Sequence, residues 1–123
     1  MGSYLYTKNG EITFNSEFAD KMLAAIKKEA NNKSWDNYGW ANEIRNAESL
    51  EDVLREFEIN VKDIGNGWVS CTVNNAYNSA FLETMLECSA EYLEDSEMEI
   101  SNSDDNSILT IKIKDGNVTT EWN

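Results

Sequence analysis

Apolar and polar residues follow one another in patterns that divide the chain into strands and helices. Residues 4–7 and 11–14 alternate on either side of Asn9-Gly10, a pair typical of tight hairpin turns, so we expect a β-hairpin at the start. In residues 18–30 the apolar side chains recur three and four positions apart. This spacing predicts an amphipathic helix with one buried face.

The middle of the chain is less regular. Residues 34–46 are rich in aromatic side chains and fit either a short irregular helix or an aromatic loop. Ser49 has the spacing of a capping residue in front of a short amphipathic helix. Residues 58–62 and 68–73 alternate on either side of the turn residues 65–67, which predicts a second hairpin.

A second long helix is predicted from about Ala76 to Glu94 by an apolar face that runs along it. The side chains of that face are Tyr77, Phe81, Leu82, Met85, Leu86, Tyr92 and Leu93. Residues 98–100 and 109–113 then predict a third hairpin with a polar tip, and a further tight turn leads into a last strand at 118–122.

The order of these elements predicts an α+β two-layer sandwich. Successive hairpins give a mostly antiparallel sheet, and two long helices with one or two short ones are expected on one face of it. We see no repeat and no linker in the 123 residues, a length at which one hydrophobic core is usual. Residues 1–123 are therefore expected to form a single domain.

Negative charge is spread very unevenly along the chain. From Asp63 to Ile111 there are ten acidic residues and no Lys or Arg, so this run carries ten of the thirteen net negative charges. Concentrated like charge destabilises a folded domain through repulsion, and it usually serves solubility or a cationic partner. The acidic run is the main functional clue in the sequence.

Four glutamates of the second long helix fall on one side of an ideal helix, opposite its apolar face: Glu83, Glu87, Glu91 and Glu94. Four residues of helix rise about 6 Å, so this row of anions is on the scale of a phosphate backbone. The charge continues beyond the helix in Asp95, Glu97, Glu99, Asp104 and Asp105. One interpretation is a solvated face kept for solubility. The functional one is a surface that occupies a Lys/Arg-rich groove that normally holds nucleic acid.

Direct binding to nucleic acid or to a membrane is not expected. Affinity for nucleic acid comes from neutralising phosphates, which a chain with a net charge of −13 opposes. No apolar run approaches the ~20 residues that span a bilayer, and the first residues lack the pattern of a signal peptide. We expect a cytoplasmic protein.

Trp35, Tyr38 and Trp40 form a second candidate surface, because Trp and Tyr are enriched in interface hot spots. Core packing is the competing interpretation, for Trp40 in particular. If these aromatic side chains are the interface, the alternative function is an accessory or scaffolding module. It would associate with itself or with a neighbouring protein, and its acidity would serve only solubility. A monomer and a small homo-oligomer are both compatible with the sequence.

Residue types that support catalysis are scarce. The chain has no histidine, the six glycines form no phosphate-binding loop, and Cys71 and Cys88 occur where small buried hydrophobic residues are expected. The polar segment 103–107 lacks the spacing of a calcium loop and reads as a solvated hairpin tip. We therefore expect no enzymatic activity, no metal and no cofactor.

Three segments resemble parts of small acidic α+β proteins encoded by phages and mobile elements. They are Glu11-Ile12-Thr13-Phe14, Ser49-Leu50-Glu51-Asp52-Val53-Leu54, and Lys114-Asp115-Gly116-Asn117-Val118 with Trp122. The small size and strong negative charge also resemble the anti-CRISPR proteins as a class. That resemblance implies a bacterial host cell, and as partner a protein with a basic nucleic-acid-binding groove, such as a CRISPR effector.

Overall fold

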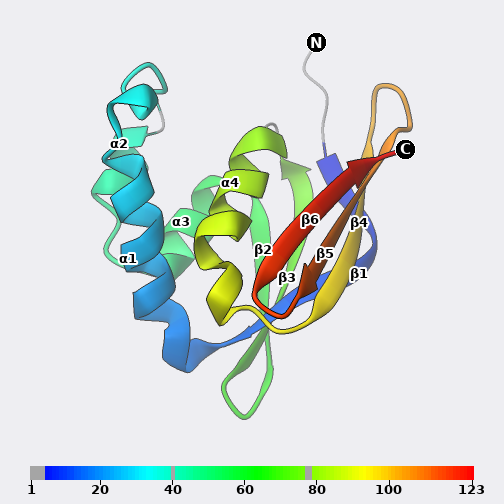
Figure 1. The fold of residues 1–123 in the computed structure, drawn as a ribbon, viewed down its shortest axis with the longest axis horizontal. Coiled ribbons are helices and arrows are strands. Elements are labelled where there is room, and N and C mark those ends of the chain that lie inside the picture. The colour runs from blue at the N-terminus through cyan, green and yellow to red at the C-terminus, as the bar shows by residue number, and fades with distance from the viewer. Residues whose placement is uncertain (1–4, 40, 77–78) are drawn as a thin grey trace.

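The computed structural model describes residues 5–39, 41–76 and 79–123, in which helices pack on one face of a six-stranded sheet (Figure 1). The strands are β1 (Leu5–Asn15), β2 (Ile59–Gly65), β3 (Trp68–Ala76), β4 (Ser96–Asn102), β5 (Ile108–Lys114) and β6 (Asn117–Trp122). The helices are α1 (Ala19–Ala30), α2 (Ala41–Arg45), α3 (Leu50–Glu56) and α4 (Ser79–Ser89), with 3₁₀ turns η1 (Ser16–Phe18), η2 (Lys33–Trp35) and η3 (Ala90–Tyr92). The strand order is β2-β3-β1-β4-β5-β6, and the described pairings are antiparallel. The predicted α+β class is confirmed.

β1 is one continuous strand and not the hairpin that Asn9-Gly10 predicted. It pairs with β3 on one side and with β4 on the other, so it gains two ladders of hydrogen bonds where a hairpin would give one. The register with β4 shifts between Thr7 and Asn9, which leaves Lys8 as an extra residue. Gly10 has φ +79°, and a Cβ there would collide with the backbone oxygen of Glu97. Gly10 therefore lets β1 and β4 approach each other closely, and it does not form a turn.

The other turns lie where the sequence predicted them. Asn66-Gly67 joins β2 to β3 and Asp115-Gly116 joins β5 to β6, and both pairs have positive φ angles, as a two-residue hairpin turn requires. The Oγ of Ser49 accepts a hydrogen bond from the backbone nitrogen of Asp52 (3.2 Å) and caps α3. The irregular stretch 34–46 contains part of η2 and the five-residue helix α2.

The second long helix is shorter than predicted. β3 continues to Ala76, and α4 spans only Ser79–Ser89 before the chain tightens into η3. The backbone is extended again at Leu93, and the amide of Glu94 donates to the carbonyl of Thr13 in β1 (2.9 Å). The helix ends early because the chain has to return to the sheet. Tyr77, Trp40 and the side chain of Phe81 lie outside the described residues.

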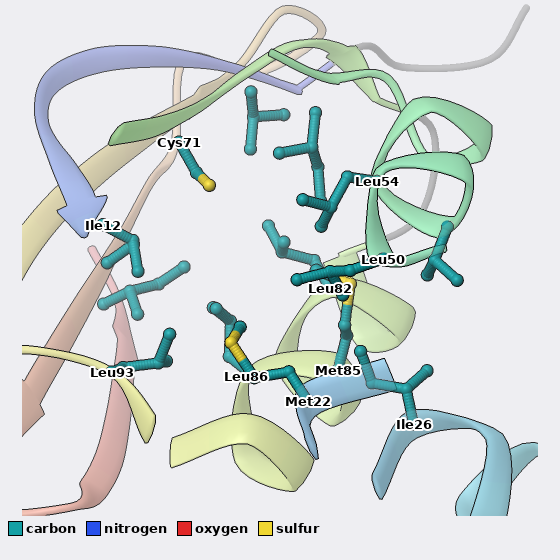
Figure 2. Packing of buried hydrophobic residues seen from close by; sticks show 14 of the residues in the cluster. Ile12, Met22, Ile26, Leu50, Leu54, Cys71, Leu82, Met85, Leu86 and Leu93 are labelled. Carbon is teal, nitrogen blue, oxygen red and sulfur yellow. The ribbon is translucent and has the colours of Figure 1, made fainter. Parts of the chain in front are cut away.

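The core fills the space between the sheet and the helices. Figure 2 shows side chains from β1, β3 and helices α1, α3 and α4 converging there. The most deeply buried large residues include Ile12, Ile26, Ile44, Ile100 and Ile111. A cavity of about 30 Å³ remains in the core between residues such as Ile12, Ile26 and Met85, which is room for about one water molecule and too little for a substrate. No helix in the described ranges is long and apolar enough to cross a membrane.

Candidate partner-binding surfaces

α4 carries the first two glutamates of the predicted acidic row. Leu82, Met85 and Leu86 of this helix are buried in the core, whereas Glu87 is exposed and Glu83 is half-buried. The two carboxylates are four residues apart on one side of the helix, where like charges repel by a few tenths of a kcal/mol. The sequence of α4 contains no Lys or Arg to offset that repulsion.

The predicted row of four anions on one helix is wrong, because α4 ends at Ser89. Glu91 lies in the 3₁₀ turn η3, and its Cα is close to the β5–β6 turn, 3.7 Å from where a Cβ on Gly116 would lie. Glu94 follows on extended chain whose amide is bonded to Thr13. Both glutamates are exposed, but they do not continue the helical spacing of Glu83 and Glu87.

Asp95 is paired with residues that come after the acidic run. Its Oδ1 accepts a hydrogen bond from the backbone nitrogen of Asp115 (2.9 Å), and the Nζ of Lys114 lies 3.3 Å from its Oδ2. The Asp115 amide, and after it Lys114, hold the pKa of the Asp95 carboxyl below its usual range. Residues 63–111 contain no Lys or Arg, but the fold places the basic side chain of Lys114 beside one of their carboxylates.

Glu97 and Glu99 point to the other side of the sheet from α4. They alternate along β4 with Met98 and Ile100, which are buried in the core beneath the helices. Successive side chains of a strand point to opposite faces, so the two glutamates lie on the face that no described helix covers (Figure 1). Cross-strand partners place eight residues there, which we call the open sheet face: Asn9, Glu11, Glu97, Glu99, Thr110, Lys112, Thr119 and Glu121.

Two carboxylates face each other across β1 and β4 on the open sheet face. Glu97 lies opposite Glu11 on one side and opposite Lys112 of β5 on the other. Like charges directly opposite one another destabilise an antiparallel pair. The hydroxyl of Ser70 in β3 donates to the Oε2 of Glu11, so this carboxylate is held in position.

The next row of the open sheet face is also acidic. The Nδ2 of Asn9 donates to the Oε1 of Glu99 (3.3 Å), and Thr110 lies opposite Glu99 on the other side. Glu121 of β6 lies opposite Thr110. Glu11, Glu97, Glu99 and Glu121 therefore share one face, although they come from three separate parts of the sequence.

The sequence interpretation missed Glu11 and Glu121, because neither belongs to the acidic run. One signal was present for Glu11: it precedes Ile12 and Phe14 in an alternating stretch, so it had to point away from the core. Its position beside Glu97 depends on β1 pairing with β4, and the predicted hairpin at Asn9-Gly10 hid that pairing.

The β4–β5 tip is held by hydrogen bonds among its own residues, including the Asp105 carboxylate. The Oδ1 of Asp105 accepts hydrogen bonds from the Oγ (2.6 Å) and backbone nitrogen (2.9 Å) of Ser107, which lower the pKa of this carboxyl. The amide of Asp104 donates to the Oδ1 of Asn102 (2.9 Å). Across the described ranges, no group of three or more His, Cys, Asp or Glu side chains is arranged to hold a metal ion.

The described part of the aromatic segment is divided between core and surface. Trp35 is only 7 % exposed and packs in the core, so little of this side chain is open to a partner, and its part in partner binding stays a prediction. Tyr38 is 50 % exposed, and Trp40 lies outside the described residues. Asp36 pairs with Arg45 (2.8 Å), which also donates to the last carbonyl of α1 and fixes the segment against that helix.

The two cysteines are poor nucleophiles. Burial raises the pKa of the Cys71 thiol to about 12, and the nearby charge of Glu11 adds to the effect. Burial also raises the pKa of Cys88, with smaller contributions from Glu29 and Glu87. Because the thiolate is the reactive form, both side chains are protonated and inert at neutral pH.

Comparison with known proteins adds no relative. No family model, curated protein or solved structure matches this chain. Function is therefore inferred from the geometry of the surfaces described above.

Proposed function

We propose that this protein is a non-enzymatic inhibitor that occupies the basic groove of a nucleic-acid-handling protein with an acidic surface. The observation that carries the proposal is the placement of Glu11, Glu97 and Glu99 at neighbouring positions on the open sheet face. The resemblance to small acidic proteins of phages and mobile elements supports an anti-defence role, with a CRISPR effector as the first partner to test.

The spacing of these carboxylates suits a groove that binds a phosphate backbone. Neighbouring strands lie about 4.8 Å apart, and alternate residues of one strand are about 7 Å apart. A lattice of negative charge at these distances attracts Lys and Arg side chains and steers a basic partner toward the face. The central position of β1 and β4 in the sheet holds the charges at fixed positions.

The open sheet face is a better candidate than α4, since four carboxylates from three strands gather on it. Glu11 and Glu97 face each other directly, and Lys112 opposite Glu97 is the one base among the eight residues of this face. Glu83 and Glu87 are more ordinary exposed and half-buried residues of an amphipathic helix.

Charge reversal on the two acidic surfaces tests the proposal. A Glu97→Lys/Glu99→Lys variant changes the open sheet face, and a Glu83→Lys/Glu87→Lys variant makes the same change of charge on α4. Tagged proteins are used to capture partners from bacterial lysate at ~0.1 M salt, where charged surfaces still attract one another. We expect the wild type and the α4 variant to recover a nucleic-acid-binding protein that the sheet variant does not recover.

Two further measurements make the result specific. Circular dichroism checks that both variants are folded, and a competition assay measures whether the captured protein, once bound, still binds its nucleic acid. We expect binding to weaken steeply toward ~0.5 M salt. Recovery of the same partner by the sheet variant would exclude the open sheet face. Recovery of no nucleic-acid-binding protein by the wild type would exclude the inhibitor function.

A further inference from the structure

β2 is an edge strand with apolar side chains exposed on it. It pairs with β3, and within the described residues no strand lies on its other side. Val61 is 41 % exposed and Ile64 is 50 % exposed. Proteins usually protect such an edge, because its unpaired backbone groups can pair with another extended chain. β2 therefore offers both backbone hydrogen bonds and apolar contacts to a strand from outside.

A groove of about 350 Å³ lies beside β2 on the helix side of the sheet. Phe14, Leu54, Val61 and Val69 line it, and Leu50 lies at its α3 wall. Val61 lies opposite Cys71 in the β2–β3 ladder, so it points to the same side of the sheet as the core. The groove exists because the β2–β3 hairpin extends beyond α3 and α4 at this end of the molecule (Figure 1).

The rim of the groove is acidic. Glu51 and Asp63 both line it, and both are exposed. Glu51 is also paired with Arg55 of α3 (3.4 Å), so Asp63 is the rim carboxylate that has no ion pair among the described residues. The Oδ1 of Asp63 accepts a hydrogen bond from the amide of Gly65 (2.8 Å), which fixes this carboxylate at the rim. A partner with apolar and basic side chains matches this combination of an apolar wall and a negative rim.

The net charge argues against a second copy of the chain as the occupant. Each copy carries a charge of −13, so two copies repel each other before they meet. The same charge attracts a basic segment. An extended chain that adds to β2 presents alternate side chains to the groove, because strand residues point to opposite faces in turn.

We infer that the edge of β2 binds an extended basic segment of a partner protein by strand addition. One apolar side chain of that segment enters the groove opposite Val61. A Lys or Arg two positions away lies opposite Asp63. The groove lies on the helix-covered side of the sheet, at the edge formed by β2, whereas the open sheet face is the opposite side. Binding at β2 therefore does not depend on the function proposed for the open sheet face.

A synthetic peptide tests the site. The probe is a nine-residue peptide with blocked ends in which every second residue is Val or Lys in turn and the residues between them are Thr, so that one face carries both Val and Lys. Its binding is measured by calorimetry and by hydrogen exchange. We expect the peptide to bind and to protect amides of β2 but not those of the other edge strand, β6. A peptide of the same length that is methylated at alternate backbone nitrogens is expected not to bind, since it cannot complete a ladder of hydrogen bonds.

Two substitutions on one strand provide a matched pair. Val61→Glu places a charge in the groove and is expected to weaken peptide binding about tenfold or more, the loss typical of a central contact. Ile64→Glu makes the same change at an exposed position that does not line the groove, and it is expected to leave binding near the wild-type value. Both positions are exposed at an edge, so neither change removes a core contact.

The matched pair also separates this site from non-specific attraction. Val61→Glu adds a negative charge, so simple attraction of a cationic peptide would become stronger and not weaker. Asp63→Asn keeps an oxygen for the Gly65 amide but removes the charge, and it is expected to weaken binding of the Lys-Val peptide. The inference is wrong if the peptide does not bind, if Val61→Glu binds as well as Ile64→Glu, or if the methylated peptide binds equally well.

Discussion

Gly10 shows how a single residue determines which strands can meet. Asn-Gly is among the strongest hairpin signals, yet here the pair lies inside the central strand β1. The positive φ of Gly10 accommodates a shift of register, and the missing side chain lets β1 approach the carbonyl of Glu97. A local signal for φ > 0 is thus satisfied by an irregular strand as well as by a turn. Sequence alone does not separate the two outcomes.

Gly10→Ala is expected to destabilise the protein by about 2 kcal/mol or more, because the new Cβ meets backbone and the left-handed conformation is strained. Gly39→Ala is the control, since a Cβ there has no neighbour within 4 Å. We expect that change to alter the free energy of unfolding by less than about 0.5 kcal/mol. Urea denaturation of both variants measures the difference. Equal effects would contradict the role given to Gly10.

Asp95 gives a pH-dependent prediction at the same scale. Its pKa is lowered in the folded state, so its contribution to stability is present above the unfolded pKa of about 4 and is lost as the pH falls through the folded value. Asp95→Asn is therefore expected to be less stable than the wild type at pH 7, with the difference disappearing in strong acid. Denaturation at a series of pH values checks this. A difference that is the same at pH 7 and at the acid end would show that charge plays no part.

At the scale of elements, the sequence predicted most turns, α1, the cap of α3 and the hairpins after residue 58. Each of these depends on residues close together in the chain, such as Asn66-Gly67 or Ser49. The prediction failed for β1 and for the end of α4, where contacts between distant segments decide the outcome. The Glu94–Thr13 hydrogen bond is one of them. No local sequence pattern predicts a hydrogen bond between segments so far apart.

Glu11→Gln tests the opposition between stability and binding on the open sheet face. The change removes the like charge opposite Glu97, keeps an oxygen for the Ser70 hydroxyl and leaves Lys112 opposite Glu97, so it is expected to increase the free energy of unfolding by a few tenths of a kcal/mol. It is also expected to weaken capture of the basic partner. Glu99→Gln is the matched control for stability, because its neighbour across β1 is Asn9 and no such gain is expected. Thermal denaturation and the capture assay measure the two effects. A Glu11→Gln variant that is less stable would contradict this expectation.

At the scale of the whole molecule, α+β class and one-sided helices were predictable, but the arrangement of charge was not. The acidic run of the sequence is divided by the fold between α4, η3, the open sheet face and the β4–β5 tip. Glu87 and Glu97 lie in different layers although they are only ten positions apart in the sequence, while Glu11 and Glu97 become neighbours. Charge density along a sequence therefore indicates that a surface is acidic and leaves open which surface it is.

The central position of β1 in the sheet has a consequence for folding during synthesis. β1 is translated before its neighbours, and Leu5 pairs with Ala76 on one side and with Asn102 on the other. During synthesis the strand has two bare edges, with Ile12 and Phe14 uncovered, until most of the chain has left the ribosome. The sheet forms only when β1 pairs with β3 and β4, which are distant from it in the sequence. Domains with such long-range pairings fold slowly. The nascent chain is thus exposed to proteases and chaperones for longer than a helical protein of equal length.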